Sequence, residues 1–260
     1  MRIGVHAGHN PDGKVACGAV GLIKESTEAR KVKDEVIRLL KSAGHTVYDC
    51  TVNDGTSVGD IVNKQVKKSN AQQLDLTVSI HFNAGANDKT GNGKSAGVEV
   101  LMDVQEGIKK ATGERICKNV SNLGFRNRGL KTRTDLGFLN NTKAKAILVE
   151  CCFVDDKEDV DLYNYKTMAK AIAEGIHGSS ISSNSSSNKF YIETGAMSEV
   201  NANKYLEHLK ALTGWWATTI KLPDGKFIIQ TGAFTGEDNV KAKAKALTEL
   251  TGWWTTYKPQ

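Results

Sequence analysis

Two histidines and two glutamates, far apart in the chain, are placed where they could carry out metal-dependent hydrolysis. His9 follows the first apolar run of the sequence, and Glu25 begins a helical pattern. His81 and Glu150 each stand at the end of an apolar run that is typical of a strand. A catalytic zinc ion takes three ligands of histidine and carboxylate type, and a further carboxylate can move the protons of the reaction. We therefore expect His9, Glu25 and His81 to bind one Zn²⁺, with Glu150 as the catalytic carboxylate.

Each of these residues also has a structural explanation when it is considered by itself. A loop histidine such as His9 is commonly satisfied by the backbone, and a glutamate at a helix start such as Glu25 is favoured by the helix dipole. His81 and Glu150 are harder to explain in this way, because a polar end to an apolar strand and a near-buried carboxylate both need partners. The four positions form no local motif, so the prediction depends on the elements that bring them together.

Apolar periodicity predicts alternating strands and helices up to residue 177. Strands are expected over 2–7, 46–50, 74–82, 97–102 and 144–153. Helices are expected over 24–43, 58–73, 104–123, 155–163 and 165–177. The expected inner face of the helix over 104–123 comprises Ile108, Ala111, Ile116 and Val120. The basic segment 124–143 is expected to be irregular.

This alternation indicates an α/β fold. Strands that are joined through helices imply crossover connections, and therefore a mainly parallel, twisted sheet with helices on both faces. Ligands of such sheets bind beyond the carboxyl ends of the strands. His9, His81 and Glu150 are all expected near those ends, and Glu25 is expected near the first turn of the first helix. The predicted fold therefore brings the four candidate residues together.

Composition divides the chain into three parts: a domain over 1–177, a Ser/Asn-rich linker over 178–188 and a small domain over 189–260. The small domain contains an internal repeat, because segment 190–197 resembles 227–234 and Leu-Thr-Gly-Trp-Trp occurs at 212–216 and 250–254. Each unit predicts strand, helix, strand. Two units predict a β-α-β-β-α-β domain of ferredoxin-like, α+β type.

Charge and cysteine content restrict the partners. The formal net charge is +6 and the pI is near 8.9, which suits an anionic polymer, but no basic run is dense enough for a nucleic-acid patch. Five cysteines without a CxxC pair argue against a disulfide framework and favour synthesis in a reducing compartment. No apolar run reaches membrane-spanning length, and the N-terminus lacks a signal-peptide pattern. We expect neither nucleic acid nor membrane as a partner, and we favour a monomer.

The first 177 residues resemble the zinc-dependent N-acetylmuramoyl-L-alanine amidases of type 3. The resemblance is carried by Ala7-Gly8-His9, Glu25, Ser79-Ile80-His81-Phe82-Asn83-Ala84, and Val149-Glu150 followed by Phe153. It implies cleavage of the amide between N-acetylmuramic acid and L-alanine of peptidoglycan. It also implies that His9, Glu25 and His81 are the zinc ligands and Glu150 the catalytic carboxylate.

The sequence departs from this family at two places. His6 replaces an aspartate that many members carry, and we leave it out of the metal set because a strand residue three positions before His9 points elsewhere. Cys151 and Cys152 follow Glu150 where small or apolar residues are usual, and we interpret them as packing residues. They remain alternative soft ligands to be excluded.

The repeat domain resembles SPOR-like peptidoglycan-binding domains. All four tryptophans lie in its two Trp-Trp pairs, and their rings could stack on sugars. The candidate wall-binding residues are Trp215, Trp216, Trp253 and Trp254. In the alternative, one ring of each pair enters the small core and is purely structural. The basic segment 126–143 could meet wall-polymer phosphates or stem-peptide carboxylates, or it could be a solvated loop.

We expect a modular peptidoglycan hydrolase that resembles a phage endolysin acting on a Gram-positive host. Such a protein is made in the host cytoplasm without a signal peptide, reaches the wall through a holin, and binds peptidoglycan and possible secondary wall polymers. A sporulation or mother-cell-lysis autolysin would have the same layout. Two further alternatives are a zinc peptidase acting on the stem peptide and a catalytically silent wall-binding protein.

Overall fold

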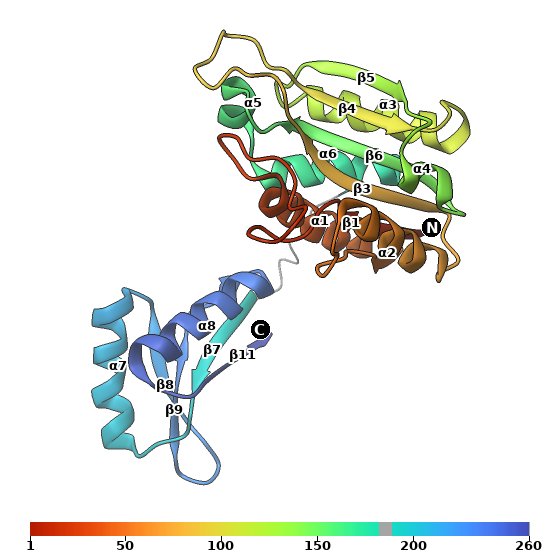
Figure 1. Ribbon diagram of the computed structural model, residues 1–260. Coiled ribbons are helices and arrows are strands. Elements are labelled where there is room, and N and C mark those ends of the chain that lie inside the picture. Colours follow the sequence, from red (N-terminus) through yellow and green to blue (C-terminus); the bar gives the residue numbers. More distant parts are fainter. Residues whose placement is uncertain (182–188, 260) are drawn as a thin grey trace. The chain divides into compact units, whose positions relative to one another are not determined.

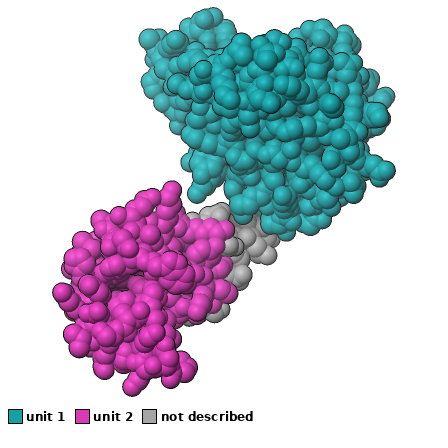
Figure 2. All heavy atoms as spheres, turned by 60° about the horizontal axis from the view of Figure 1, so that its bottom comes forward, with its two compact units in different colours: residues 1–182 teal, residues 183–260 magenta. Residues whose placement is uncertain are grey.

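The computed structural model describes residues 1–181 and 189–259 (Figure 1). Most of the predicted linker, residues 182–188, lies outside the described residues. The chain forms two compact units, Met1–Ser182 and Ser183–Gln260 (Figure 2). Within the described residues, we find no helix with the length and apolarity that crossing a membrane requires.

A six-stranded sheet forms the centre of the first unit. Its order is β2 (Thr46–Asp49), β1 (Arg2–Ala7), β3 (Leu76–Asn83), β6 (Lys145–Phe153), β4 (Val98–Met102) and β5 (Asn127–Thr132). All neighbouring pairs are parallel except β4 with β6, which is antiparallel. The prediction of a mainly parallel α/β sheet is therefore confirmed.

Helices cover both faces of this sheet. They are α1 (Glu25–Ser42), α2 (Val58–Asn70), α3 (Gly107–Ser121), α4 (Gly137–Asn141), α5 (Lys157–Leu162) and α6 (Tyr165–His177). α1, α3 and α6 build the main hydrophobic core with one face of the sheet. α2 and α4 pack on the other face, around a smaller apolar cluster that includes Leu101, Phe138 and Leu148.

Strand alternation decides which side chains reach each face, because successive residues of a strand point to opposite sides. In β3, Val78 and Ile80 enter the main core, so His81 lies on the face that α2 and α4 cover. In β6, Val149 enters the main core and Glu150 lies on the opposite face. The two candidate residues of the central strands therefore share one side of the sheet.

One local prediction in this unit was half right and another was wrong. The buried face of α3 comprises Lys109, Thr112, Gly113, Ile116, Cys117 and Val120, so Ile116 and Val120 are confirmed, whereas Ile108 and Ala111 are exposed. Ile108 is exposed, because Lys109 turns inward beside it and places its ammonium group on the Asp103 carboxylate. The segment 124–143 is not irregular, since it contains β5 and α4. β5 is a half-exposed edge strand and α4 has five residues, so neither leaves a periodic apolar pattern.

The second unit contains β7 (Lys189–Thr194), α7 (Glu199–Thr213), β8 (Ala217–Lys221), β9 (Phe227–Thr231), β10 (Phe234–Thr235), α8 (Glu237–Thr251) and β11 (Thr255–Pro259). The antiparallel sheet runs β11, β7, β9, β8, and the short β10 also pairs with β7. Apart from β10, this is the β-α-β-β-α-β order that the repeat predicts. Its core includes Ile192, Leu209, Ile229 and Leu247.

Candidate metal centre and active site

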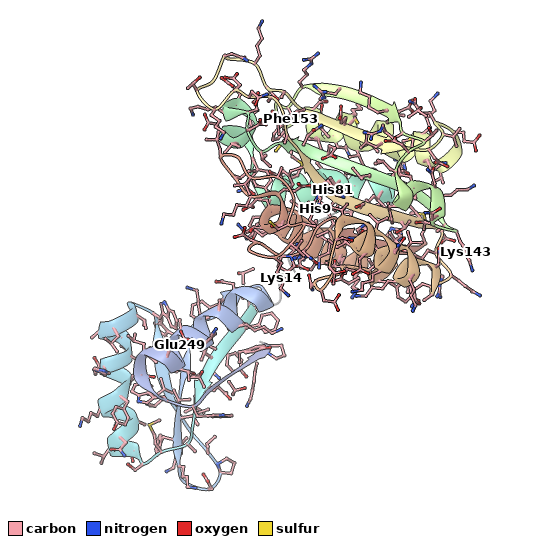
Figure 3. The ribbon with its side chains drawn as sticks, viewed as in Figure 1. His9, Lys14, His81, Lys143, Phe153 and Glu249 are labelled. Carbon is pink, nitrogen blue, oxygen red and sulfur yellow. The ribbon has the colours of Figure 1, made fainter. Side chains whose placement is uncertain are left out.

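Three of the predicted residues converge at the carboxyl ends of β1 and β3. Glu25 Oε1 lies 3.2 Å from His9 Nε2 and 3.0 Å from His81 Nδ1. The two imidazole rings lie edge to face with centroids 4.9 Å apart, and Figure 3 shows both side chains at the same edge of the sheet. One ligand atom from each residue lies within 4.8 Å of the other two. The three side chains could therefore bind one metal ion.

Glycine residues make room for this cluster. A Cβ atom on Gly8 would lie 1.9 Å from the His81 ring, so no other residue fits between β1 and that imidazole. Gly18 has a φ of +81°, and a Cβ atom there would lie 2.5 Å from Glu25 Oε2. The loop that follows β1 can wrap closely around the cluster only because these two positions lack side chains.

Glu25 is held as an anion at the start of α1. It is 3% exposed, and its carboxylate accepts hydrogen bonds from the backbone amides of Ala19 and Phe82 at 2.8 and 3.2 Å. Burial alone would raise the pKa of Glu25, but the hydrogen bonds with His81 and His9 outweigh it and hold the pKa well below its usual range. A carboxylate in this form is ready to bind a cation.

Arg30 ties the loop that carries His9 to the helix that carries Glu25. Its Nη2 donates to the His9 carbonyl and to Asn53 Oδ1, each at 2.7 Å, and its Nη1 donates to the Ser26 carbonyl at 3.0 Å. Nothing in the sequence marks Arg30 as a residue of the site. The available signal was a cation five positions after Glu25 on a helix, which is too common to be informative.

Glu150 lies beside the cluster on the neighbouring strand. It pairs with His81 across β3 and β6, and with Glu99 across β4 and β6. Its Oε2 is buried and has no hydrogen-bond partner in the described parts of the chain. Burial raises the pKa of Glu150 well above its ordinary value, the negative charges of Glu25 and Glu99 raise it further, and Arg133 opposes them. A carboxyl group whose pKa is raised in this way can act as a proton carrier.

Glu99 extends this polar row across the sheet. It accepts hydrogen bonds from Asn83 Nδ2 and Arg128 Nε, both at 2.8 Å. The Arg128 guanidinium also lies over the Phe153 ring, 4.9 Å from its centroid. The sequence marks Arg128 only as part of the basic segment 126–143 and does not mark Glu99, because the relation of Glu99 to Glu150 arises from the antiparallel register of β4 and β6, which no local pattern encodes.

A cavity of about 240 Å³ opens beside the cluster. His9, His81 and Glu150 form its reactive edge, and Arg133 also lines it. Apolar side chains of α2 and α4 and of the sheet make up most of the remaining wall, among them Ile61, Val62, Leu101 and Phe138. A substrate could therefore reach the candidate metal ligands and Glu150 at the same time.

The residues that depart from the family pattern lie apart from the cluster. His6 is fully buried, both ring nitrogens lack a hydrogen-bond partner among the described residues, and its ring packs edge-on against Phe138 with centroids 4.5 Å apart. Burial, followed by the charge of His81, lowers the pKa of His6 to about 3. Cys151 and Cys152 are fully buried, and burial raises the pKa of both thiols, so they pack as small apolar side chains.

The tryptophans of the second unit divide into two kinds. Trp215 and Trp253 pack against its core. Trp216 and Trp254 are 67% and 68% exposed. Each pair thus contributes one ring to the core and presents the other to solvent, because neighbouring residues point in opposite directions.

The fold and the cluster define a candidate metal-dependent hydrolase of the α/β class. The chain belongs to the N-acetylmuramoyl-L-alanine amidase family (Amidase_3), whose match covers residues 3–179.

Two curated relatives match part of the chain. An uncharacterised protein of Clostridium perfringens is 35% identical over 193 residues, which cover 71% of this chain and 54% of that protein. An endolysin of Bacillus phage SPP1 is 31% identical over 176 residues, covering 65% of this chain and 60% of the endolysin. The chain thus spans little more than half the length of these curated relatives.

A solved structure matches the first unit. The catalytic domain of the CD27L endolysin targeting Clostridia difficile has 27% sequence identity and a TM-score of 0.61. The match covers 70% of this chain and 99% of that domain.

Proposed function

We propose that this protein is a zinc-dependent N-acetylmuramoyl-L-alanine amidase that hydrolyses the amide between N-acetylmuramic acid and L-alanine of peptidoglycan. The observation that carries the proposal is the convergence of His9, Glu25 and His81 beside Glu150, in a chain of the amidase family. Membership of the family supplies the substrate class, and the four side chains supply the chemical groups that hydrolysis requires.

The three clustered residues fit a zinc ion. Two imidazoles and one carboxylate form a donor set that catalytic zinc sites use, and Glu25 is kept ionised between the two rings. Glycines at positions 8 and 18 leave the space that such a set needs. When bound, zinc acts as a Lewis acid toward a carbonyl group and lowers the pKa of water.

Glu150 performs the proton transfers. It accepts a proton from the water molecule whose oxygen attacks the carbonyl carbon of the lactyl group. It then gives that proton to the amide nitrogen as the carbon–nitrogen bond breaks. The products are the muramic carboxylic acid and the free amine of L-alanine. The buried, unpartnered Oε2 and the raised pKa of Glu150 support this role.

Digestion of purified cell walls tests the proposal. We expect mass spectrometry to find new free N-terminal L-alanine, with release abolished by a chelator and restored by zinc. A new amine inside the stem peptide would identify a peptidase instead. If the intact, zinc-supplemented protein released no wall fragments, the alternative of a catalytically silent wall-binding protein would be favoured.

We also propose that the protein acts as an endolysin on the wall of a Gram-positive host, and that the second unit holds it there. The similarity to the endolysin of Bacillus phage SPP1 and to the CD27L catalytic domain supports the first role. The exposed Trp216 and Trp254 support the second, since an aromatic face can stack on a sugar ring. We further propose that the second unit is a SPOR-like domain and that the protein reaches the wall through a holin.

A further inference from the structure

Arg133 is a cation at the candidate active site that has no role in the proposed reaction. It follows β5 and lines the same cavity as His9, His81 and Glu150. Its backbone amide donates to the Met102 carbonyl at 2.8 Å, which fixes its Cα at the end of β4. The residue is therefore anchored, although it belongs to a loop.

Only one edge of the Arg133 guanidinium group is bound by a neighbouring side chain. Nε and Nη2 donate to the two carboxylate oxygens of Asp135, each at 2.8 Å. Nη1 makes no hydrogen bond to any residue in the described ranges, and the side chain is 44% exposed. A guanidinium group has a second edge, formed by Nη1 and Nη2, that can bind another planar carboxylate with two hydrogen bonds. Asp135 is also exposed, so water screens its charge and it orients Arg133 without occupying that edge.

The cavity restricts which anion could reach this edge. Its volume is about 240 Å³, and it holds Glu150 and both histidines of the cluster. Only groups close to the scissile amide can lie there together with those residues. On the amine side of that bond the substrate is a peptide, whose anionic groups are carboxylates. Most of the remaining wall is apolar, so Arg133 is the group suited to receive such a charge.

We propose that Arg133 is a specificity-determining residue that binds a free carboxylate of the stem peptide, on the residue that follows L-alanine. This inference rests on the proposed amidase function. It assigns Arg133 to substrate selection and leaves proton transfer to Glu150. The protein therefore discriminates between stem peptides that carry a free carboxylate at this place and those in which it is amidated.

Two synthetic N-acetylmuramoyl peptides that differ only in this group, a carboxylate or its primary amide, test the proposal on the full-length protein. We expect the wild type to favour the carboxylate about tenfold in kcat/KM, mainly through KM. Arg133→Gln should reduce this ratio to near one by slowing the carboxylate substrate far more than the amide, and Arg133→Lys should retain part of it. Lys118→Gln removes an exposed charge from α3 and should leave the ratio unchanged.

Equal cleavage of the two peptides by the wild type, or an unchanged preference in Arg133→Gln, would overturn the proposal. The role of Arg133 can also be tested without turnover, by comparing the Kd values of the two peptides for the Glu150→Gln variant with and without Arg133→Gln. Failure of the amidase function would appear separately, as loss of cleavage of both peptides. A Kd ratio near one would contradict the role of Arg133 in either case.

Discussion

Glu25 and Glu150 show how the same side chain acquires two different properties in one site. Both are withdrawn from water, yet the pKa of Glu25 is lowered and the pKa of Glu150 is raised. The difference comes from neighbours, because Glu25 lies between two imidazoles, whereas Glu150 faces the carboxylates of Glu25 and Glu99. Two carboxylates with pKa values driven apart suit a division between an anionic ligand and a proton carrier.

At the same scale, His6 should make the first unit sensitive to acid. Its pKa in the folded protein is about 3, below the ordinary value of 6.5, so the folded state keeps His6 neutral while the unfolded chain takes up a proton. The contribution of neutral His6 to the free energy of unfolding is fully present above pH 6.5 and is lost as the pH falls toward 3. When the pH is lowered from 7.5 to 5, protonation linked to His6 alone should reduce the free energy of unfolding by about 2 kcal/mol.

Urea unfolding followed by far-ultraviolet circular dichroism measures this cost, with a chelator present to exclude metal-linked effects. All four tryptophans lie in the second unit, so fluorescence follows that unit separately. The loss between the two pH values should shrink by about 2 kcal/mol in His6→Leu relative to the wild type. An equal loss in both proteins would contradict the burial of a neutral His6.

At the scale of elements, α1 and the loop after β1 depend on Arg30 for their relative position. Arg30→Met removes hydrogen bonds to the carbonyls of His9 and Ser26 and to Asn53. We expect zinc affinity to fall by about tenfold or more, because groups that orient metal ligands commonly contribute this much. Arg38→Met, an arginine substitution on the same helix, serves as the control. Competition with a chromophoric chelator measures the affinity, and equal values for the two variants would refute this role.

The elements that carry the four site residues were predictable, because buried strands and amphipathic helices leave strong periodic signals. β3 and β6 are mostly buried, and His81 and Glu150 are polar residues in their carboxyl-terminal halves. The positions of β5 and α4 were not predictable, since an edge strand and a five-residue helix bury too few side chains. Arg133 lies between these two elements, so its place beside the cavity could be recognised only in three dimensions.

At the scale of the whole molecule, we propose that the two units divide wall recognition from catalysis. The internal repeat predicted the second fold, and the Trp-Trp pairs identified its candidate surface residues. Sequence alone could not tell which ring of each pair is exposed, because that depends on how each strand meets the core. It also could not reveal Glu99, whose place next to Glu150 follows from one antiparallel pairing within a mostly parallel sheet.

The two exposed tryptophans should carry wall binding. Replacing both Trp216 and Trp254 with serine should weaken retention on purified cell walls about thirtyfold, since each stacked ring contributes about 1 kcal/mol. Sedimentation of the protein with insoluble walls measures this. Trp215→Ser should instead destabilise the second unit, because Trp215 packs against its core. Undiminished retention of the Trp216/Trp254 double variant would show that another surface binds the wall.

Metal content distinguishes the proposed metal ligands, His9, Glu25 and His81, from the proposed proton carrier, Glu150. Elemental analysis should find about one zinc ion per molecule in the wild type and in Glu150→Ala, and almost none in His9→Ala or His81→Ala. Glu150→Ala should keep its metal and lose wall hydrolysis. Loss of zinc from Glu150→Ala, or its retention in both histidine variants, would contradict the assignment.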